Sequence, residues 1–293
     1  MNILLIGCGR VGKAITENLL DLKQVQKIYL FSKTSKSSKS LACELNSKKV
    51  KPIKSITNLK NIDYVIIALS EMDYSAREES LQNKNNTYEI RQDELKFNLS
   101  AVSQLITTLK TFSKETKIIV VTNPVDEITN FLRIILKKFC VLGFGLELDA
   151  KRLEKQLGKK IFCIGTHGKA IPLLNLKNKS EYLTIQKQTD ESLLKFCRKN
   201  GIPHSIAGMT FKDFFERLNS EKMEIIHVSS YIKNAFGIRD ISISLPFNVK
   251  KGQILGPAKI SLNNIEKELF IESADELKKS IANILDLQKI QFI

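Results

Sequence analysis

The chain has 293 residues, 43% hydrophobic and 26% charged, so it is long enough to bury a core of its own and is neither a disordered nor a fibrous sequence. Lysine and arginine outnumber aspartate and glutamate by 46 to 31, which gives a formal net charge of +15. This surplus predicts anionic partners, so nucleic acid, anionic lipid and small anionic metabolites all have to be weighed.

Cysteine spacing and the length of the apolar runs bear on the cellular compartment. The five cysteines are widely spaced beside apolar residues and form no C-x-x-C pattern, which favours reduced, buried thiols. The first apolar run, Ile3 to Ile6, is too short for a signal peptide, and no later stretch approaches the roughly 18 uninterrupted apolar residues that a membrane span needs. We therefore expect a cytoplasmic protein with no membrane partner.

Short apolar runs alternate with segments of helical period along the first half of the chain. Strands are expected at 2–6, 27–31, 64–69, 118–121 and 141–142, with amphipathic helices at 11–19, 95–109 and 123–136. This alternation implies a parallel sheet covered on both faces. A helix at about 148–157 and a strand at 161–164 follow. After Gly168 the order loosens into a mixed α+β half that ends in a long helix from about 264 to 287.

Gly7, Gly9 and Gly12 match the pattern G-x-G-x-x-G at the point where the first expected strand gives way to a helix. In that context the first glycine permits a tight turn, the second lets the backbone approach a pyrophosphate, and the third lets helix and strand pack closely. The alternative is a glycine-rich turn without a ligand. We interpret the loop as the phosphate-binding turn of a Rossmann-type domain, with Arg10 and Val11 among its cofactor contacts.

The residue after the second expected strand bears on the choice of nicotinamide cofactor. An NAD-specific site has a carboxylate there for the ribose 2′-hydroxyl. In this sequence the position is Ser32, and Lys33, Thr34, Ser35 and Lys36 follow. Hydroxyl and ammonium groups suit a 2′-phosphate, so NADP is the preferred cofactor and NAD the second candidate. A solvated loop whose lysines contact nothing is the alternative interpretation.

Three segments further along carry side chains that could do chemistry together, namely V-T-N-P-V-D from 121, L-D-A-K-R from 148 and G-T-H-G-K from 165. Each has a plain structural explanation when taken alone. Asn123 is a good helix N-cap, with Asp126 in the first turn. Asp149 and Arg152 form an i, i+3 ion pair at a helix start. His167 is a lone histidine in a glycine turn, which is more often structural than catalytic.

Taken together and in chain order, the glycine loop and these three segments resemble the lactate/malate dehydrogenase family. The resemblance continues in H-V-S-S-Y from 227, F-G-I-R-D-I-S-I-S-L-P from 236 and E-S-A-D-E-L from 272. It implies an α/β fold with a Rossmann-type parallel-sheet domain over residues 1–145 and a mixed α+β substrate domain over 146–293. It also implies hydride transfer between a nicotinamide cofactor and a small anionic 2-hydroxy or 2-oxo acid, in a homodimer or homotetramer.

The resemblance implies a role for each polar residue of the three segments. His167 would take the hydroxyl proton as the hydride leaves C2, with Asp149 orienting its ring. Arg152 would bind the substrate carboxylate through its planar guanidinium. Asn123, next to Val121 in the cofactor site, would contact both the nicotinamide and the substrate oxygen.

Arg91 and Asn98 keep the family's seven-residue spacing of an arginine and an asparagine after the fourth strand. The resemblance implies that Arg91 polarises the substrate carbonyl from a mobile loop and that Asn98 contacts the cofactor. Without the resemblance, Arg91 would be interpreted as a solvated arginine at a helix end.

The loop of residues 70–90 departs from the family pattern because it is longer. Its specificity position, six residues before Arg91, holds Asn85 beside Lys84, where malate enzymes have arginine and lactate enzymes glutamine. Lys84 or Arg77 could bind a second carboxylate, whereas Asn85 alone suits a neutral substituent. The sequence leaves this choice open.

Two other functions compete with the dehydrogenase. A non-catalytic dinucleotide-binding or regulatory descendant of the family would bind cofactor without turnover. A nucleic-acid binder would exploit the basic charge, but the chain has no recognisable binding motif and no tryptophan, so we expect no nucleic-acid partner. The three histidines lie far apart in the sequence, and we expect no metal.

Overall fold

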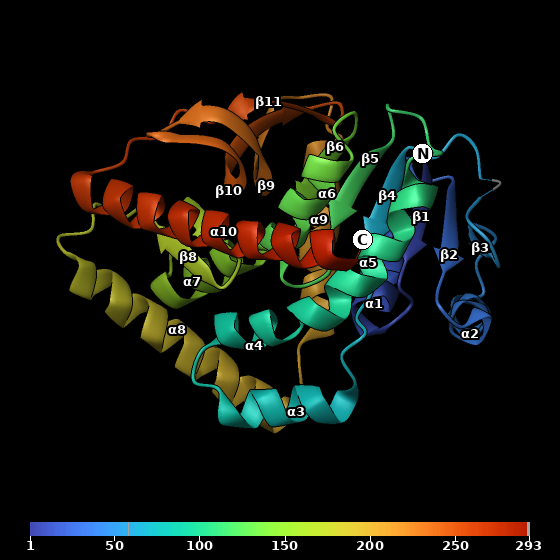
Figure 1. Cartoon of the computed structure of the whole chain (residues 1–293), viewed down its shortest axis with the longest axis horizontal. Coiled ribbons are helices and arrows are strands. Elements are labelled where there is room, and N and C mark those ends of the chain that lie inside the picture. Colours follow the sequence, from blue (N-terminus) through green and yellow to red (C-terminus); the bar gives the residue numbers. More distant parts are fainter. Residues whose placement is uncertain (58, 292–293) are drawn as a thin grey trace.

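Six parallel strands form the part of the sheet contributed by the first half of the chain (Figure 1). The computed structural model describes residues 1–57 and 59–291 and orders these strands β3-β2-β1-β4-β5-β6. This is the strand order of dinucleotide-binding sheets, with the reversal between β1 and β4, so the predicted α/β fold with a Rossmann-type sheet is confirmed. The strands are β1 (Asn2–Ile6), β2 (Lys27–Phe31), β3 (Val50–Pro52), β4 (Tyr64–Ile67), β5 (Lys117–Val120) and β6 (Cys140–Gly143).

Helices cover both faces of these strands, which explains why the strands read as continuous apolar runs rather than alternating ones. Leu5 of β1 enters the core that contains Ile15, whereas the neighbouring Leu4 enters the opposite core with Val102 and Ile128. All five side chains are fully buried or nearly so. The covering helices are α1 (Arg10–Leu20), α2 (Ser35–Leu45), α5 (Leu95–Leu109) and α6 (Val125–Ile135).

The second half of the chain adds an antiparallel extension to the same sheet. A single bridge pair, Gly143 with Ser229, joins β6 to it. The predicted division between residues 145 and 146 falls between β6 and the next helix, and residues 292–293, the end of the predicted second domain, lie outside the described residues. The elements are α7 (Leu146–Leu157), β7 (Cys163–Thr166), β8 (Lys169–Pro172), α8 (Lys179–Asn200), α9 (His204–Leu218), β9 (Glu224–Ala235), β10 (Ile238–Lys250), β11 (Gln253–Pro257) and α10 (Asn264–Gln291).

The segment expected to be a long mobile loop, residues 70–90, is mostly helical. It forms α3 (Tyr74–Asn83), and α4 (Thr87–Asp93) follows directly. Side chains cap both helices, because Asp73 accepts a hydrogen bond from Ala76 N and Asn86 accepts one from Glu89 N, each at 2.8 Å. The prediction of a loop was wrong here. Asp73 and Asn86 each precede by three residues the N–H group that they cap, and this N-cap position is the sequence signal that could have revealed the helices.

Asn123 and Pro124 precede α6 rather than opening it. The helix predicted from residue 123 begins at Val125, and Pro124 is extended, with φ −72° and ψ 125°, after a cis peptide bond. Asn123 is therefore not the N-cap of this helix. It stays at the carboxyl end of β5, which is the edge of the sheet where ligands bind in this type of fold.

No helix in the described part of the chain is both long enough and apolar enough to cross a membrane.

Glu147, in the first turn of α7, is a buried carboxylate that joins α7, α9 and β9. It accepts hydrogen bonds from His227 N at 2.8 Å and from His227 Nδ1 at 2.9 Å, and it pairs with Arg217. His227 Nε2 accepts from Cys163 N at 3.1 Å, so Nδ1 carries the ring proton. Burial alone would raise the pKa of Glu147, but His227 and Arg217 outweigh it and lower that pKa to about 2.

Glu147→Gln should lower the free energy of unfolding at neutral pH by about 2–4 kcal/mol, because the partly buried Arg217 cation loses its buried carboxylate partner and keeps only the half-exposed Asp213. The wild-type carboxylate stabilises the fold fully above its ordinary pKa of 4.5, and this contribution is lost as the pH falls towards about 2. Urea unfolding should therefore show a smaller difference between wild type and variant at about pH 3.5 than at about pH 7.

Glu221→Gln is the matched control, since it removes an exposed ion pair in which Glu221 Oε2 lies 2.7 Å from Lys251 Nζ. This variant should change stability little at either pH. An effect of Glu147→Gln that is equal at both pH values would contradict the assignment of the stabilisation to the charged carboxylate.

Candidate active site

A cleft of about 1320 Å³ lies at the carboxyl ends of β1, β2, β4 and β5. It contains Asn123 at the end of β5 and the glycine loop between β1 and α1. The predicted cofactor residues that line it are Gly7, Gly9, Arg10, Val11, Ser32, Lys33, Val121 and Asn123. The structure thus brings together residues that are separated by more than a hundred positions in the sequence.

The glycine loop has the shape that a pyrophosphate needs. A Cβ on Gly7 (φ +105°) would lie 2.5 Å from the backbone of Ala68, and one on Gly12 would lie 2.0 Å from Gly7 O. Gly9 has open space where its Cβ would be. This glycine precedes α1, which has no side-chain cap and no carboxylate in its first turn. The amino end of α1 is therefore suited to an anion, and the residues present fit a dinucleotide.

Asp149, in the first turns of α7, is the hub of a buried polar cluster. Its Oδ2 accepts hydrogen bonds from His167 Nδ1 at 2.7 Å and from Gly168 N at 2.8 Å, and its Oδ1 accepts one from Arg152 Nη1 at 2.9 Å. Burial alone would raise the pKa of Asp149. Interactions with His167, including its hydrogen bond, and with the Arg152 and Arg91 cations outweigh burial and hold the pKa of this carboxyl well below its usual range.

His167 lies in the turn between β7 and β8, and only 8% of its surface is exposed. Burial lowers the pKa of the imidazole to about 4, with Arg91 acting in the same direction and Asp149 opposing both. The ring is therefore neutral at pH 7. Because Nδ1 faces the Asp149 carboxylate, Nδ1 carries the proton and Nε2 is the basic nitrogen.

Asp126, on the first turn of α6, positions the backbone of this histidine. Its Oδ2 accepts a hydrogen bond from His167 N at 2.7 Å, and its Oδ1 accepts one from Ser244 Oγ at 3.1 Å. From the sequence, Asp126 was expected only as a structural residue in the first turn of a helix. Burial raises the pKa of Asp126 to about 6. The position of Asp126 in the same N-P-V-D segment as Asn123 is the sequence signal that could have identified it as a site residue.

Arg91 lies on α4 and is buried, rather than solvated or on a loop. A Cβ on Gly168 (φ +94°) would lie 2.5 Å from Arg91 Nη1, so the guanidinium packs directly on the turn that carries His167. Arg91 Nη1 is buried and has no hydrogen-bond partner among residues 1–57 and 59–291. A buried guanidinium with an unused donor is suited to an anionic or carbonyl oxygen.

Asn98 is buried next to the wall of the cleft and does not line the cleft itself. It is fully buried, and its Nδ2 donates to Asn123 O at 2.7 Å while its Oδ1 accepts from Glu71 N at 2.9 Å. The side chain thus holds the segment that carries Asn123. A contact between Asn98 and the cofactor stays a prediction.

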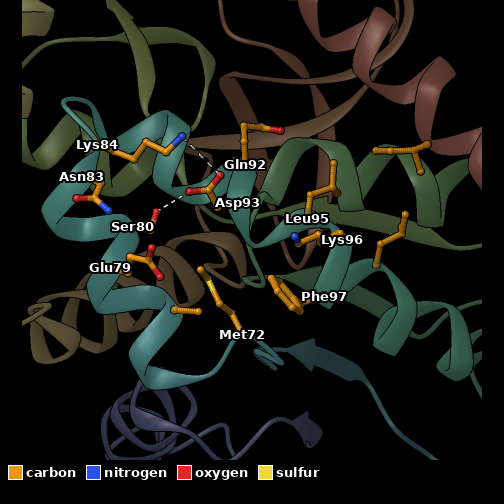
Figure 2. A pocket seen from close by; sticks show the side chains of 13 residues that line it. Met72, Glu79, Ser80, Asn83, Lys84, Gln92, Asp93, Leu95, Lys96 and Phe97 are labelled. Carbon is orange, nitrogen blue, oxygen red and sulfur yellow. Dashed lines mark hydrogen bonds and ion pairs between the residues drawn. The ribbon is translucent and has the colours of Figure 1, made fainter.

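Lys84 and Asn85 lie away from this cluster. Lys84 lines a separate pocket of about 490 Å³ beside α3, α5 and α10, where its Nζ is 3.8 Å from Asp93 Oδ1. Figure 2 shows Lys84 and Ser80 both directed toward Asp93. Asn85 is exposed in the turn between α3 and α4. Within the described ranges, neither residue hydrogen-bonds to the cluster formed by Asp149, His167, Arg91 and Arg152. Arg77, by contrast, lines the cleft.

Comparison with known proteins agrees with this arrangement. A family model described as the lactate/malate dehydrogenase NAD-binding domain matches residues 1–141. L-lactate dehydrogenase 2 of Clostridium acetobutylicum is 22% identical over 311 residues, which cover 96% of this chain and 97% of that protein. The L-lactate dehydrogenase C chain of Sus scrofa is 25% identical over 211 residues, covering 61% of this chain and 64% of that one.

Two solved structures share the fold over almost the whole chain. The malate dehydrogenase of Salinibacter ruber has a TM-score of 0.81 at 18% identity and covers 99% of this chain and 100% of its own. That of Cryptosporidium parvum has a TM-score of 0.76 at 20% identity, with 97% and 99% covered. Residues 1–141 therefore match the NAD-binding domain of the lactate/malate dehydrogenase family, and the chain has the fold of these dehydrogenases over almost its whole length.

Proposed function

We propose that the protein is a nicotinamide-dependent dehydrogenase that interconverts a small 2-hydroxy acid and its 2-oxo acid. The observation that carries this proposal is the buried Asp149–His167 pair, with a 2.7 Å hydrogen bond, between two arginines. This combination supplies a neutral base and two cations for an anionic substrate. A non-catalytic descendant would have no use for the buried charges, which are costly to retain.

His167 is proposed to accept the substrate's hydroxyl proton. In the oxidation direction, the C2–H bond breaks with its electron pair, the O–H bond breaks with its proton going to His167 Nε2, and the C2–O bond becomes double. When bound, the oxidised nicotinamide is the hydride acceptor. Asp149 keeps Nδ1 protonated and stabilises the imidazolium that forms.

The two arginines are proposed to divide the recognition of the substrate. Arg152, 25% exposed at its side chain, can offer its planar donors to the C1 carboxylate. Arg91, with its unused Nη1, can polarise the C2 oxygen in the reverse direction. A bound carboxylate offsets the positive charges that lower the pKa of His167, and this coupling favours the protonated ring that reduction requires.

His167→Asn should reduce turnover at least about 100-fold, because the amide cannot accept the hydroxyl proton. The dissociation constants of NADH and NADPH should change less than about threefold, since His167 does not line the cleft. The measurement is the absorbance of the reduced cofactor with a panel of 2-oxo acids, together with a fluorescence titration of cofactor binding. Cofactor binding by the wild type without oxidation by any acid of the panel would contradict the enzyme assignment and favour the non-catalytic alternative.

We further propose that the cofactor is NADP. Ser32, Lys33, Thr34 and Lys54 line the cleft near the end of β2, and α2 begins at Ser35 with no carboxylate in its first turn. Lys33 Nζ lies 2.6 Å from Glu71 Oε2, so part of its charge is already balanced. Lys54 supplies a second cation that the sequence did not single out.

Lys33→Ala and Lys54→Ala should each weaken NADPH binding by about tenfold and NADH binding much less, because only NADPH has the 2′-phosphate. Lys36→Ala is the matched control, since Lys36 is exposed on α2 and does not line the cleft. Fluorescence titration with both reduced cofactors measures these constants. Equal losses for NADPH and NADH would count against a 2′-phosphate site.

A further inference from the structure

Glu127 is a buried carboxyl for which the proposed reaction has no use. It lies in the first turn of α6, next to Asp126, and is 2% exposed. Its Oε1 accepts a hydrogen bond from Gln92 Nε2 at 2.6 Å, and Tyr88 Oη lies 3.5 Å away at the limit of a hydrogen bond. Both partners belong to α4, the short helix that carries Arg91.

The partners of Glu127 are neutral groups. The described part of the chain offers it no ion pair, and burial together with the neighbouring Asp126 raises the pKa of Glu127 to about 7. A buried carboxyl without a counter-charge is costly, and the hydrogen bonds that the Glu127 side chain makes within the described ranges go to α4. The side chain also does not line the cofactor cleft. Its contacts therefore connect α6 with α4 rather than with a ligand.

Other contacts hold α4 at the same place. Thr87 donates to Asp190 Oδ1 of α8 from both its N (3.2 Å) and its Oγ1 (2.8 Å). Lys169 Nζ, at the start of β8, lies 4.2 Å from the centre of the Tyr88 ring. These partners come from the second half of the chain, and α3 adds a further contact, since Ser80 Oγ donates to Asp93 Oδ2 at 2.6 Å. Since α4 has only seven residues, these tertiary contacts decide where it lies.

We propose that Glu127 is a positioning residue of the dehydrogenase, which fixes α4 so that Arg91 lies against the His167 turn. Tyr88 and Gln92 are four residues apart and thus share one face of α4. Glu127, on α6, faces both side chains and is their common hydrogen-bond acceptor. Arg91 lies between them in sequence and packs on Gly168. Loss of the acceptor leaves the partly buried Gln92 amide without its hydrogen-bond partner and removes a contact between α6 and α4, which favours release of the helix and displacement of Arg91. This inference rests on the proposed function.

Glu127→Leu tests the proposal, because leucine has a similar size but accepts no hydrogen bond. The variant should lower kcat about tenfold or more and leave the cofactor dissociation constant within about twofold. Hydrogen exchange of residues 87–93, measured without substrate, should become faster, while exchange of β1 and β4 stays the same. Glu127→Gln, which keeps an acceptor oxygen, should restore both kcat and exchange to near the wild-type values.

Glu89→Leu is the matched control. It makes the same substitution on α4, but at an exposed side chain, and should leave kcat and exchange unchanged. A double-mutant cycle then separates positioning of Arg91 from a general structural effect. In an Arg91→Lys background, Glu127→Leu should reduce turnover by less than about threefold, because the residue through which it acts is already altered.

The outcomes that would overturn the inference are distinct from those that bear on the proposed function. Unchanged exchange at residues 87–93 in Glu127→Leu would overturn the docking of α4 by Glu127. A loss of turnover that is undiminished in the Arg91→Lys background would overturn its action through Arg91. Absence of turnover in the wild type would contradict the proposed function instead, and the exchange measurement would still decide whether Glu127 holds α4.

Discussion

The structure of the site depends on one buried charge, the carboxylate of Asp149. A buried carboxylate is tolerated only when donors surround it, and here the histidine ring, a backbone N–H and a guanidinium do so. The geometry of the other parts follows from this requirement. His167 must present Nδ1 to the carboxylate, which leaves Nε2 as the basic nitrogen. Gly168 must lack a Cβ, because Arg91 packs where that carbon would be.

The backbone around this charge is held by a second buried acid. Asp126 binds His167 N from α6, so the histidine turn is fixed between a helix of the first half of the chain and a helix of the second. Asn98 acts in a similar way on the cleft wall, since it holds the carbonyl of Asn123. Polar side chains with full sets of partners thus set the relative position of the cofactor cleft and the catalytic cluster.

A few of the cations behind the net charge of +15 lie at the polar cluster and the cleft. Two arginines beside a neutral histidine make the catalytic cluster attractive to a small anion. Lys33 and Lys54 line the cleft and are the cations that we propose for the cofactor phosphate. Many other lysines are exposed, where they affect solubility and long-range attraction rather than recognition.

The sequence by itself determined the parallel sheet, the glycine loop and the identity of the side chains that we propose to be catalytic. Apolar periodicity and glycine spacing are local properties, and G-T-H-G, L-D-A-K-R and N-P-V-D are short segments that can be recognised without knowing how they meet. The tertiary structure decided the rest. The helices of residues 74–93 have weak apolar periodicity, and contacts with α6, α8 and β8 fix α4. Asp126 and Glu127 are neighbours in sequence, yet they bind His167 and α4 respectively, because successive side chains on a helix point in different directions.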